Sequence, residues 1–223
     1  MKLCLILAVI FASMFVAVGA QYITAAKPAI AVVTAHPDDL ESGIGTRIIV
    51  TNPSPIRWGG ADKTDDQLLT HVEVLNRLGA ALRELGLLLA YHNHDAELRQ
   101  GGREFHHMLR VTNPDDVKFC LDAHWIFCGC GDSEVAVFDA VEHYGSRIIE
   151  LHLRQSRGGV WSEVFEGNAD LGYSRLTAWL RGHGLKPQVM LEQAVEKASQ
   201  HTLDAEAAHR QSLADAQQVF ATL

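Results

Sequence analysis

Four segments in the second half of the chain each carry a metal-ligand residue at or near the end of an apolar run. The segments are Leu87–Glu97, Val117–Trp125, Arg147–Arg154 and Gln188–Gln193, and they supply Glu97, Asp122, His152 and Glu192. Carboxylates with one imidazole suit a hard divalent ion. If the four segments are consecutive strands of a (β/α) barrel, these side chains meet at the carboxyl ends of the strands. The residue types therefore indicate a metalloenzyme.

One reaction that such a site could support is proton transfer next to a carbonyl group. Removing that proton creates an enediolate, and a divalent ion bound to the two substrate oxygens stabilises its charge. Two carboxylates on opposite faces of the substrate could remove and return the proton. We expect Mn²⁺, Mg²⁺ or Co²⁺ in an oxygen-rich shell with one imidazole, with Zn²⁺ as the alternative.

The elements that must position these residues alternate between strand and helix. Arg47–Thr51 is a short apolar run, and Thr64 with Gln67 three residues later forms a capping box that predicts a helix start. Leucines and valines recur at helical spacing from there to Leu82, and a last helix is expected over Thr202–Val219. The strands are continuous apolar runs, which is typical of a parallel sheet buried on both faces. The pattern predicts an α/β fold.

The composition fits one sizeable folded domain with a small-molecule ligand. The chain has 223 residues, of which 48% are hydrophobic and 21% charged, with a formal net charge of −8. This length is enough for a core of its own. The acidic balance and the lack of a Lys/Arg run argue against nucleic acid and anionic membranes as partners.

Residues 1–20 have the pattern of a secretory signal peptide. A short basic start with Lys2 precedes a long apolar stretch, and Val18 and Ala20 are small residues placed for cleavage. The pattern predicts a secreted or periplasmic protein that is free of the membrane after cleavage. An uncleaved membrane anchor is the alternative.

The cysteines do not form a disulfide framework by their spacing. Cys4 lies in the leader, and Cys120 lies inside an apolar run, where we expect a small core residue. Cys128 and Cys130 form a C-x-C in a glycine-flanked loop. A second cysteine pair that would complete a zinc site is missing, so a loop without special chemistry is expected.

Several motifs in fixed order resemble the sugar phosphate isomerase/epimerase family. They are YHNHDAE, LDAHW, ELHLRQS and MLEQ, and TNPSPIRW and RQSRGGVWSE resemble one branch of that family. The resemblance covers about residues 46–223. It implies a TIM barrel of the xylose isomerase-like type and activity as an isomerase or epimerase of a sugar or polyol derivative. The barrel family alone would imply a cytoplasmic protein.

The resemblance also implies roles for the four strand-end residues. Glu97, Asp122, His152 and Glu192 would hold the metal ion, and Glu97 and Glu192 would also exchange protons with the substrate carbon. Each residue has a plainer interpretation. Glu97 would then lie in a solvated loop and His152 would be a hydrogen-bonded core histidine, whereas Asp122 and Glu192 would be costly to bury without a partner.

Three further residues match substrate-binding positions of the family. His92 and His94 match histidines at the rim of the pocket, and Arg154 matches a basic group near substrate oxygens. All three could instead be structural polar residues.

The chain departs from the family at its front. A complete barrel needs eight strand–helix units and typically about 250 residues, whereas only five family-like strands are counted here. We therefore predict a partial barrel over residues 46–223 that lacks the first strand–helix units. Its two open edges would favour a homo-oligomer. A non-catalytic truncated barrel or fusion remnant is accordingly an alternative function.

The segment before the barrel has a resemblance of its own. AHPDDLESG, within residues 29–46, resembles the start of the PIG-L or LmbE-like deacetylase family. His36 and Asp39 would match two zinc ligands and Asp38 the general base. This implies a third function, a zinc-dependent deacetylase of an N-acetyl sugar, although catalytic zinc sites usually have three protein ligands. Residues 21–45 would then be a separate N-terminal segment.

Overall fold

A computed structural model describes residues 30–32, 48–51, 60–192, 195–196 and 198–223. The expected signal peptide and the alternative zinc residues His36, Asp38 and Asp39 lie outside the described residues. The predictions that rest on them therefore stay predictions.

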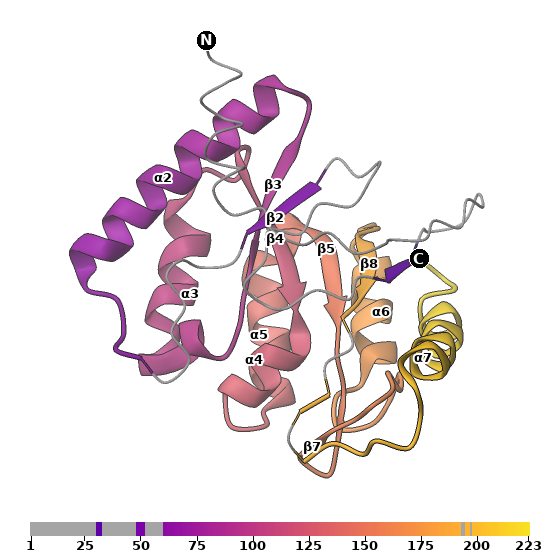
Figure 1. The fold of residues 1–223 in the computed structure, drawn as a ribbon. Coiled ribbons are helices and arrows are strands. Elements are labelled where there is room, and N and C mark those ends of the chain that lie inside the picture. Colours follow the sequence, from indigo (N-terminus) through magenta and orange to yellow (C-terminus); the bar gives the residue numbers. More distant parts are fainter. Residues whose placement is uncertain (1–29, 33–47, 52–59, 193–194, 197) are drawn as a thin grey trace.

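A six-stranded parallel sheet forms the centre of the described chain (Figure 1). Its strand order is β1-β8-β5-β4-β3-β2. The strands are β1 (Ile30–Val32), β2 (Ile48–Thr51), β3 (Leu88–His92), β4 (Val117–Asp122), β5 (Ile148–Leu153) and β8 (Gln188–Leu191). A short antiparallel hairpin follows β5 and consists of β6 (Ser156–Arg157) and β7 (Val160–Trp161).

Helices connect the parallel strands. They are α2 (Asp65–Glu84), α3 (Arg99–Val111), α4 (Ala123–Gly129), α5 (Glu134–Tyr144), α6 (Tyr173–Gly182) and α7 (Ala205–Val219), with 3₁₀ turns at Ala96–Leu98 and Gly145–Arg147. Strand and helix alternate along the chain and neighbouring strands run parallel, which is the connectivity of a (β/α) barrel. The predicted partial barrel is therefore confirmed.

Helix α2 shows how local sequence fixes an element. Its cap is the predicted box, in which Gln67 N–H donates to Thr64 Oγ1 at 3.3 Å and Thr64 N–H donates to Gln67 Oε1 at 2.9 Å. The buried stripe from Leu68 to Leu82 faces the sheet. Gly86 has a φ of +74°, which only glycine adopts without strain, and it turns the chain directly into β3.

The sheet is buried on both faces, as predicted. The large core lies between the sheet and the helices and contains Tyr91, Phe119, Leu121 and Leu151. The opposite face carries a small apolar cluster that includes Val50, Ala90 and Cys120. Toward the carboxyl ends of the strands this second face becomes polar. This face of the sheet is thus apolar at one end and polar at the other.

Three expectations from the sequence need correction. The sheet has six strands and not five, because Ile30–Val32 pairs in parallel with β8 through Ile30↔Val189. Strand β3 ends at His92 and not at Glu97, because the chain turns there into the 3₁₀ turn. The last helix begins at Ala205, where the Asp204 carboxylate caps Ala207 N–H at 2.8 Å.

Within the described residues, no helix combines the length and the apolar character needed to cross a bilayer.

Candidate metal centre

The carboxyl ends of β3, β4 and β8 bring three ligand residues together. One ligand atom each from His92, Asp122 and Glu192 lies within 4.8 Å of the other two, and all three side chains are buried. His92 Nε2 lies 3.7 Å from Asp122 Oδ2. His152, from the end of β5, joins the group through Nδ1, which lies 2.8 Å from Glu192 Oε2. The structure therefore brings together three of the four predicted metal ligands, Asp122, His152 and Glu192.

Arg154 links the two carboxylates of this group. Its Nε donates to Asp122 Oδ2 at 3.0 Å, and its terminal nitrogen pairs with Glu192 Oε1. The side chain is buried with them. Removing two carboxylates from water is costly unless a cation lies between them. Arg154 supplies that cation, and this contact is consistent with its predicted place beside the site.

Burial and these contacts decide the protonation of the group. Burial by itself raises the pKa of Glu192, but Arg154 and His152 outweigh this effect and hold the pKa well below its usual range. Burial lowers the pKa of His92 well below its usual range, so that its imidazole is neutral at pH 7. Burial raises the pKa of Asp122 against the opposing effect of Arg154. A neutral imidazole and an ionised carboxylate are the forms that bind metal ions.

Asp122 is held in place by contacts that the sequence did not reveal. It is the last residue of β4 and also the N-cap of α4, where its Oδ1 accepts from Trp125 N–H at 2.9 Å. The Asn93 side chain is bonded to the Asp122 backbone twice, at 2.9 Å and 3.0 Å. The carboxylate therefore has a fixed position with Oδ2 directed at His92 and Arg154.

Glu97 lies apart from the other predicted ligands. Its carboxylate Oε2 accepts from His94 N–H at 2.7 Å and lies 3.6 Å from His94 Nδ1. The His94 ring lies 4.5 Å from the His92 ring. Glu97 is buried, so the solvated-loop interpretation does not hold. Its predicted roles as ligand and proton carrier stay predictions, and His92 takes the position at the strand end.

Two residues of the centre were missed from the sequence. Glu150 Oε1 lies 3.1 Å from His152 Nε2, and Cys120 Sγ lies 3.8 Å from the same Glu150 oxygen. Side chains of a strand alternate between faces, so residues two apart share a face. Glu150 is two residues before His152 and Cys120 two before Asp122. This spacing was the signal that could have identified them.

The β6–β7 hairpin forms a wall beside Arg154. The Trp125 and Trp161 rings lie 4.8 Å apart, and the Arg154 guanidinium lies over both rings at 5.4 Å and 5.7 Å. The hairpin is anchored at Ser156, whose hydroxyl donates to Asp170 Oδ2 at 2.8 Å. Two rigid indoles thus restrict the guanidinium on the side away from the carboxylates.

The residues present fit a divalent ion. The two carboxylates and the His92 imidazole converge from different strands, and their ligand atoms are close enough to share one ion after small side-chain shifts. The same carboxylates now bind Arg154, whose charge an ion would partly replace. His92, Asp122 and Glu192 would hold the ion, with His152 beside Glu192.

Comparison with known proteins places this geometry among related folds. No family model matches the chain. An inosose dehydratase of Clostridium perfringens is 26% identical over 137 residues, which are 56% of this chain and 44% of that protein. The match therefore spans less than half the length of that curated relative.

Solved structures agree with the fold. A sugar phosphate isomerase/epimerase from Parabacteroides distasonis has a TM-score of 0.62 at 20% identity, covering 80% of this chain and 59% of that one. The IolI protein, solved with a zinc atom, has a TM-score of 0.57 at 18% identity, covering 78% and 63%. L-ribulose 3-epimerase has a TM-score of 0.57 at 15% identity, covering 80% and 63%.

The fold is that of the xylose isomerase-like TIM barrels. The inosose dehydratases that match in sequence share this fold. The resemblance of residues 29–46 to the PIG-L family is supported by none of these proteins.

Proposed function

We propose that the chain binds a divalent ion at the strand ends and removes a proton next to the carbonyl of a sugar or polyol, as an isomerase or epimerase. The observation that carries the proposal is the convergence of His92, Asp122 and Glu192, buried and within 4.8 Å of one another. This edge of a parallel barrel is where TIM-barrel enzymes have their active sites. Related folds act on sugars according to their names, which supports a small-molecule sugar as substrate.

The ion would supply charge stabilisation for the enediolate oxygens. Mn²⁺, Mg²⁺ and Co²⁺ suit the two carboxylates, and Zn²⁺ is supported by the zinc atom in the structure of IolI. We propose that one of these four ions is bound at the site.

Glu192 is proposed as the base. Its carboxylate is ionised, because Arg154 and His152 lower its pKa. Substrate oxygens that draw Arg154 away would raise the basicity of Glu192 toward the range that general bases need. Arg154 would then bind an oxygen of the substrate, with the Trp125 and Trp161 rings keeping water from that side.

Glu97 is proposed to support proton exchange on the opposite side of the substrate. Its contacts reach the centre through His94, whose ring lies against His92. The simplest role in this geometry is positioning: the carboxylate orients His94, and the imidazole carries the proton. Direct exchange by Glu97, as the family resemblance implies, is the competing version of the same proposal.

A second candidate is the dehydration of a keto-polyol, and the match to inosose dehydratase favours it. The first step is the same proton removal next to the carbonyl. The enediolate then expels the hydroxyl of the next carbon, so that one proton and one hydroxide leave together as water. An epimerase instead returns a proton to the same carbon.

One experiment separates the two reactions. The Mn²⁺-loaded protein is incubated in D₂O with a set of ketoses and inososes and followed by proton NMR. Deuterium that enters beside the carbonyl with all hydroxyls retained supports the epimerase, whereas loss of a hydroxyl supports the dehydratase. A protein that binds Mn²⁺ but exchanges no proton in any of these compounds would overturn both in favour of the non-catalytic barrel. The deacetylase on His36, Asp38 and Asp39 stays a prediction.

A further inference from the structure

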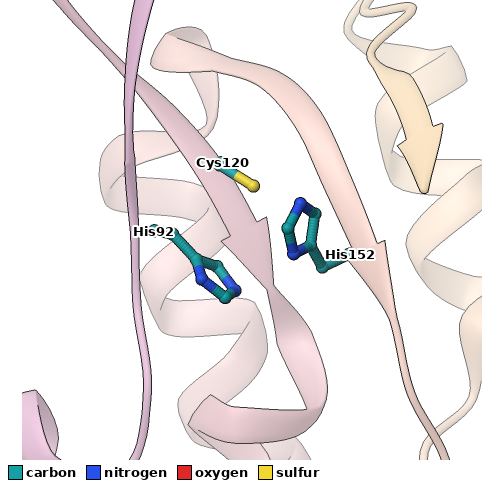
Figure 2. Close-up of side chains that lie close together, drawn as sticks. All are labelled: His92, Cys120 and His152. Atoms are coloured by element: carbon teal, nitrogen blue, oxygen red, sulfur yellow. The ribbon is translucent and has the colours of Figure 1, made fainter. Parts of the chain in front are cut away.

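A thiol and two imidazoles face one another beside the carboxylate pair, with Cys120 two residues deeper in the barrel than Asp122 on β4. Figure 2 shows His92 on β3, Cys120 on β4 and His152 on β5 pointing toward a common centre. One ligand atom from each lies within 4.8 Å of the other two. Their exposed fractions are 2%, 0% and 1%, so no bulk water separates them.

The register of the sheet explains why these residues meet. In the parallel ladder His92 is the neighbour of Cys120, and Cys120 is the neighbour of Glu150. His152 lies two residues beyond Glu150 on the same face of β5. Three adjacent strands therefore direct a thiol, a carboxylate and two imidazoles to one place by backbone pairing alone.

We infer that His92, Cys120 and His152 form a second position for a divalent ion, selective for a thiophilic ion such as Zn²⁺ or Co²⁺. Zn²⁺ is bound by Cys thiolate and His nitrogen together in tetrahedral sites, so two imidazoles and one thiolate suit it, with a fourth position left for water or a carboxylate. Thiolate ligands favour these ions over Mg²⁺ and Mn²⁺, which prefer oxygen. This position goes beyond the proposed function, since that function uses the carboxylates.

Glu150 completes the position from the side. Its Oε1 lies 3.1 Å from His152 Nε2 and 3.8 Å from Cys120 Sγ. A carboxylate in hydrogen-bond contact with a ligating histidine fixes the orientation of its ring. Binding converts the thiol to a thiolate. The adjacent Glu150 carboxylate can accept the proton, which then passes to solvent.

The two positions exclude each other. His92 belongs to both groups of three ligands, and His152 pairs with Glu192 at one position and faces Cys120 at the other. An ion bound to Cys120 therefore withdraws His92 from the carboxylates. The centre would hold an oxygen-preferring ion between the carboxylates and His92, or a thiophilic ion between Cys120 and the two imidazoles.

The other cysteines of the described chain do not offer such a position. Burial raises the pKa of Cys128 to about 12, which keeps it a thiol, and its Sγ lies 3.7 Å from Nε2 of His124. Cys130 is exposed at the end of α4. Neither is in a group of three ligands within the described residues.

Cobalt absorption tests the inference. Co²⁺ is added to the full chain carrying Cys4→Ser, Cys128→Ser and Cys130→Ser, so that Cys120 is the one remaining cysteine. We expect the near-ultraviolet sulfur-to-cobalt charge-transfer band, and we expect Zn²⁺ to abolish it by displacement. Further substitution of Cys120→Ser should remove the band and weaken Zn²⁺ binding by more than about tenfold, because even the loss of an outer-shell partner typically costs about 10–100-fold.

A second variant separates this inference from the proposed function. Asp122→Asn with Glu192→Gln removes the carboxylates, and the cobalt–sulfur band should persist in it. Circular dichroism confirms that each variant is folded, and Cys120→Ala replaces Cys120→Ser if the buried hydroxyl prevents folding. A folded protein with no cobalt–sulfur band, or with a band that depends on the carboxylates and not on Cys120, overturns the inference. Proton exchange with Mn²⁺ would be unaffected by that result.

Discussion

Charge balance among a few buried side chains decides what the centre can do. Asp122 and Glu192 face each other inside the barrel, and Arg154 and His152 neutralise them. Breaking a buried ion pair by removing one partner is strongly destabilising. The ligands are therefore preformed and held in position, and an ion or substrate has to compete with Arg154 for them.

Glu192→Gln is predicted to abolish proton exchange with the substrate while the fold is retained. The amide keeps the size and can still bond Arg154 or His152, but it cannot take up a proton. Deuterium incorporation by NMR and circular dichroism measure the two effects. Glu196→Gln, an exposed residue of the same segment, is the control and should behave as wild type. Unchanged exchange in Glu192→Gln would exclude Glu192 as the base.

Glu97→Gln distinguishes the two proposed roles of Glu97. If it positions His94, proton exchange should fall by about 10–100-fold, the usual effect of an orienting partner. Conservative Glu97→Asp should then restore part of the activity, because a carboxylate is again available to the His94 backbone N–H. Complete loss with Glu97→Asp as well would instead favour direct proton transfer by Glu97.

The structure brings together two of the predicted residues, Asp122 at the end of β4 and Glu192 directly after β8, and their roles as ligands stay predictions. Asp122 and Glu192 were identified because a carboxylate after a buried apolar run needs a partner. Glu97 was assigned to the same group because Leu87–Glu97 resembles one continuous segment. The strand ends at His92, and Glu97 lies in the 3₁₀ turn that follows it; its role as a ligand stays a prediction. Contacts across the sheet, such as Arg154 with two carboxylates, leave no local trace in sequence.

At the scale of elements, helix α2 is held on the sheet by one buried stripe. Leu82 is 1% exposed and packs in the main core, whereas Leu69 on the same helix is 58% exposed. Leu82→Ala should lower the free energy of unfolding by about 2–5 kcal/mol, through lost burial and the cavity left behind. Leu69→Ala should change it by less than about 0.5 kcal/mol. Urea denaturation measures both, and equal effects would contradict the packing described here.

The β6–β7 hairpin should detach in acid. Partial burial by itself raises the pKa of Asp170. Hydrogen bonds from Gly159 N–H, Gly158 N–H and the Ser156 hydroxyl outweigh this effect and hold the pKa below its usual range. The ionised Asp170 carboxylate stabilises the hairpin fully above about pH 4, which is the pKa of an aspartate in the unfolded chain. This stabilisation is lost as the pH falls through the lower pKa of Asp170 in the folded protein. The Ser156 hydroxyl that donates to Asp170 is also hydrogen-bonded to His124 Nε2, at 2.9 Å.

Tryptophan fluorescence should report this change, because Trp161 lies on β7 beside Trp125. The wild-type protein should show an acid transition that Asp170→Asn lacks. The same transition in both proteins would mean that another group causes it.

Helix starts were the elements most readable from sequence. The Thr64 box is confirmed, since both of its hydrogen bonds are local and join residues three apart. Helix α4 was missed, because its cap, Asp122, was assigned only as a metal ligand. Pairing of Ile30–Val32 with β8 joins residues more than 150 positions apart, and such pairing cannot be derived from a local pattern.

At the scale of the whole molecule, the chain presents two sheet ends. In the part of the chain that the structure describes, β1 and β2 each pair with one neighbouring strand. Unpaired strand edges bind other strands. We predict self-association that increases with concentration, measured by light scattering across a dilution series. A monomer at all concentrations would show that the edges are covered in another way.

We propose that the strand ends of this partial barrel assemble a working metal centre. Elemental analysis after incubation with Mn²⁺ and removal of free ion tests it most directly, because Mn²⁺ prefers oxygen ligands over the Cys120 position. We predict about one ion per chain in the wild type, and loss of most of it when Asp122→Asn and Glu192→Gln remove the carboxylates that must be ionised to bind it. No retained Mn²⁺ in the wild type, or equal retention in both proteins, would show that Asp122 and Glu192 do not hold the ion.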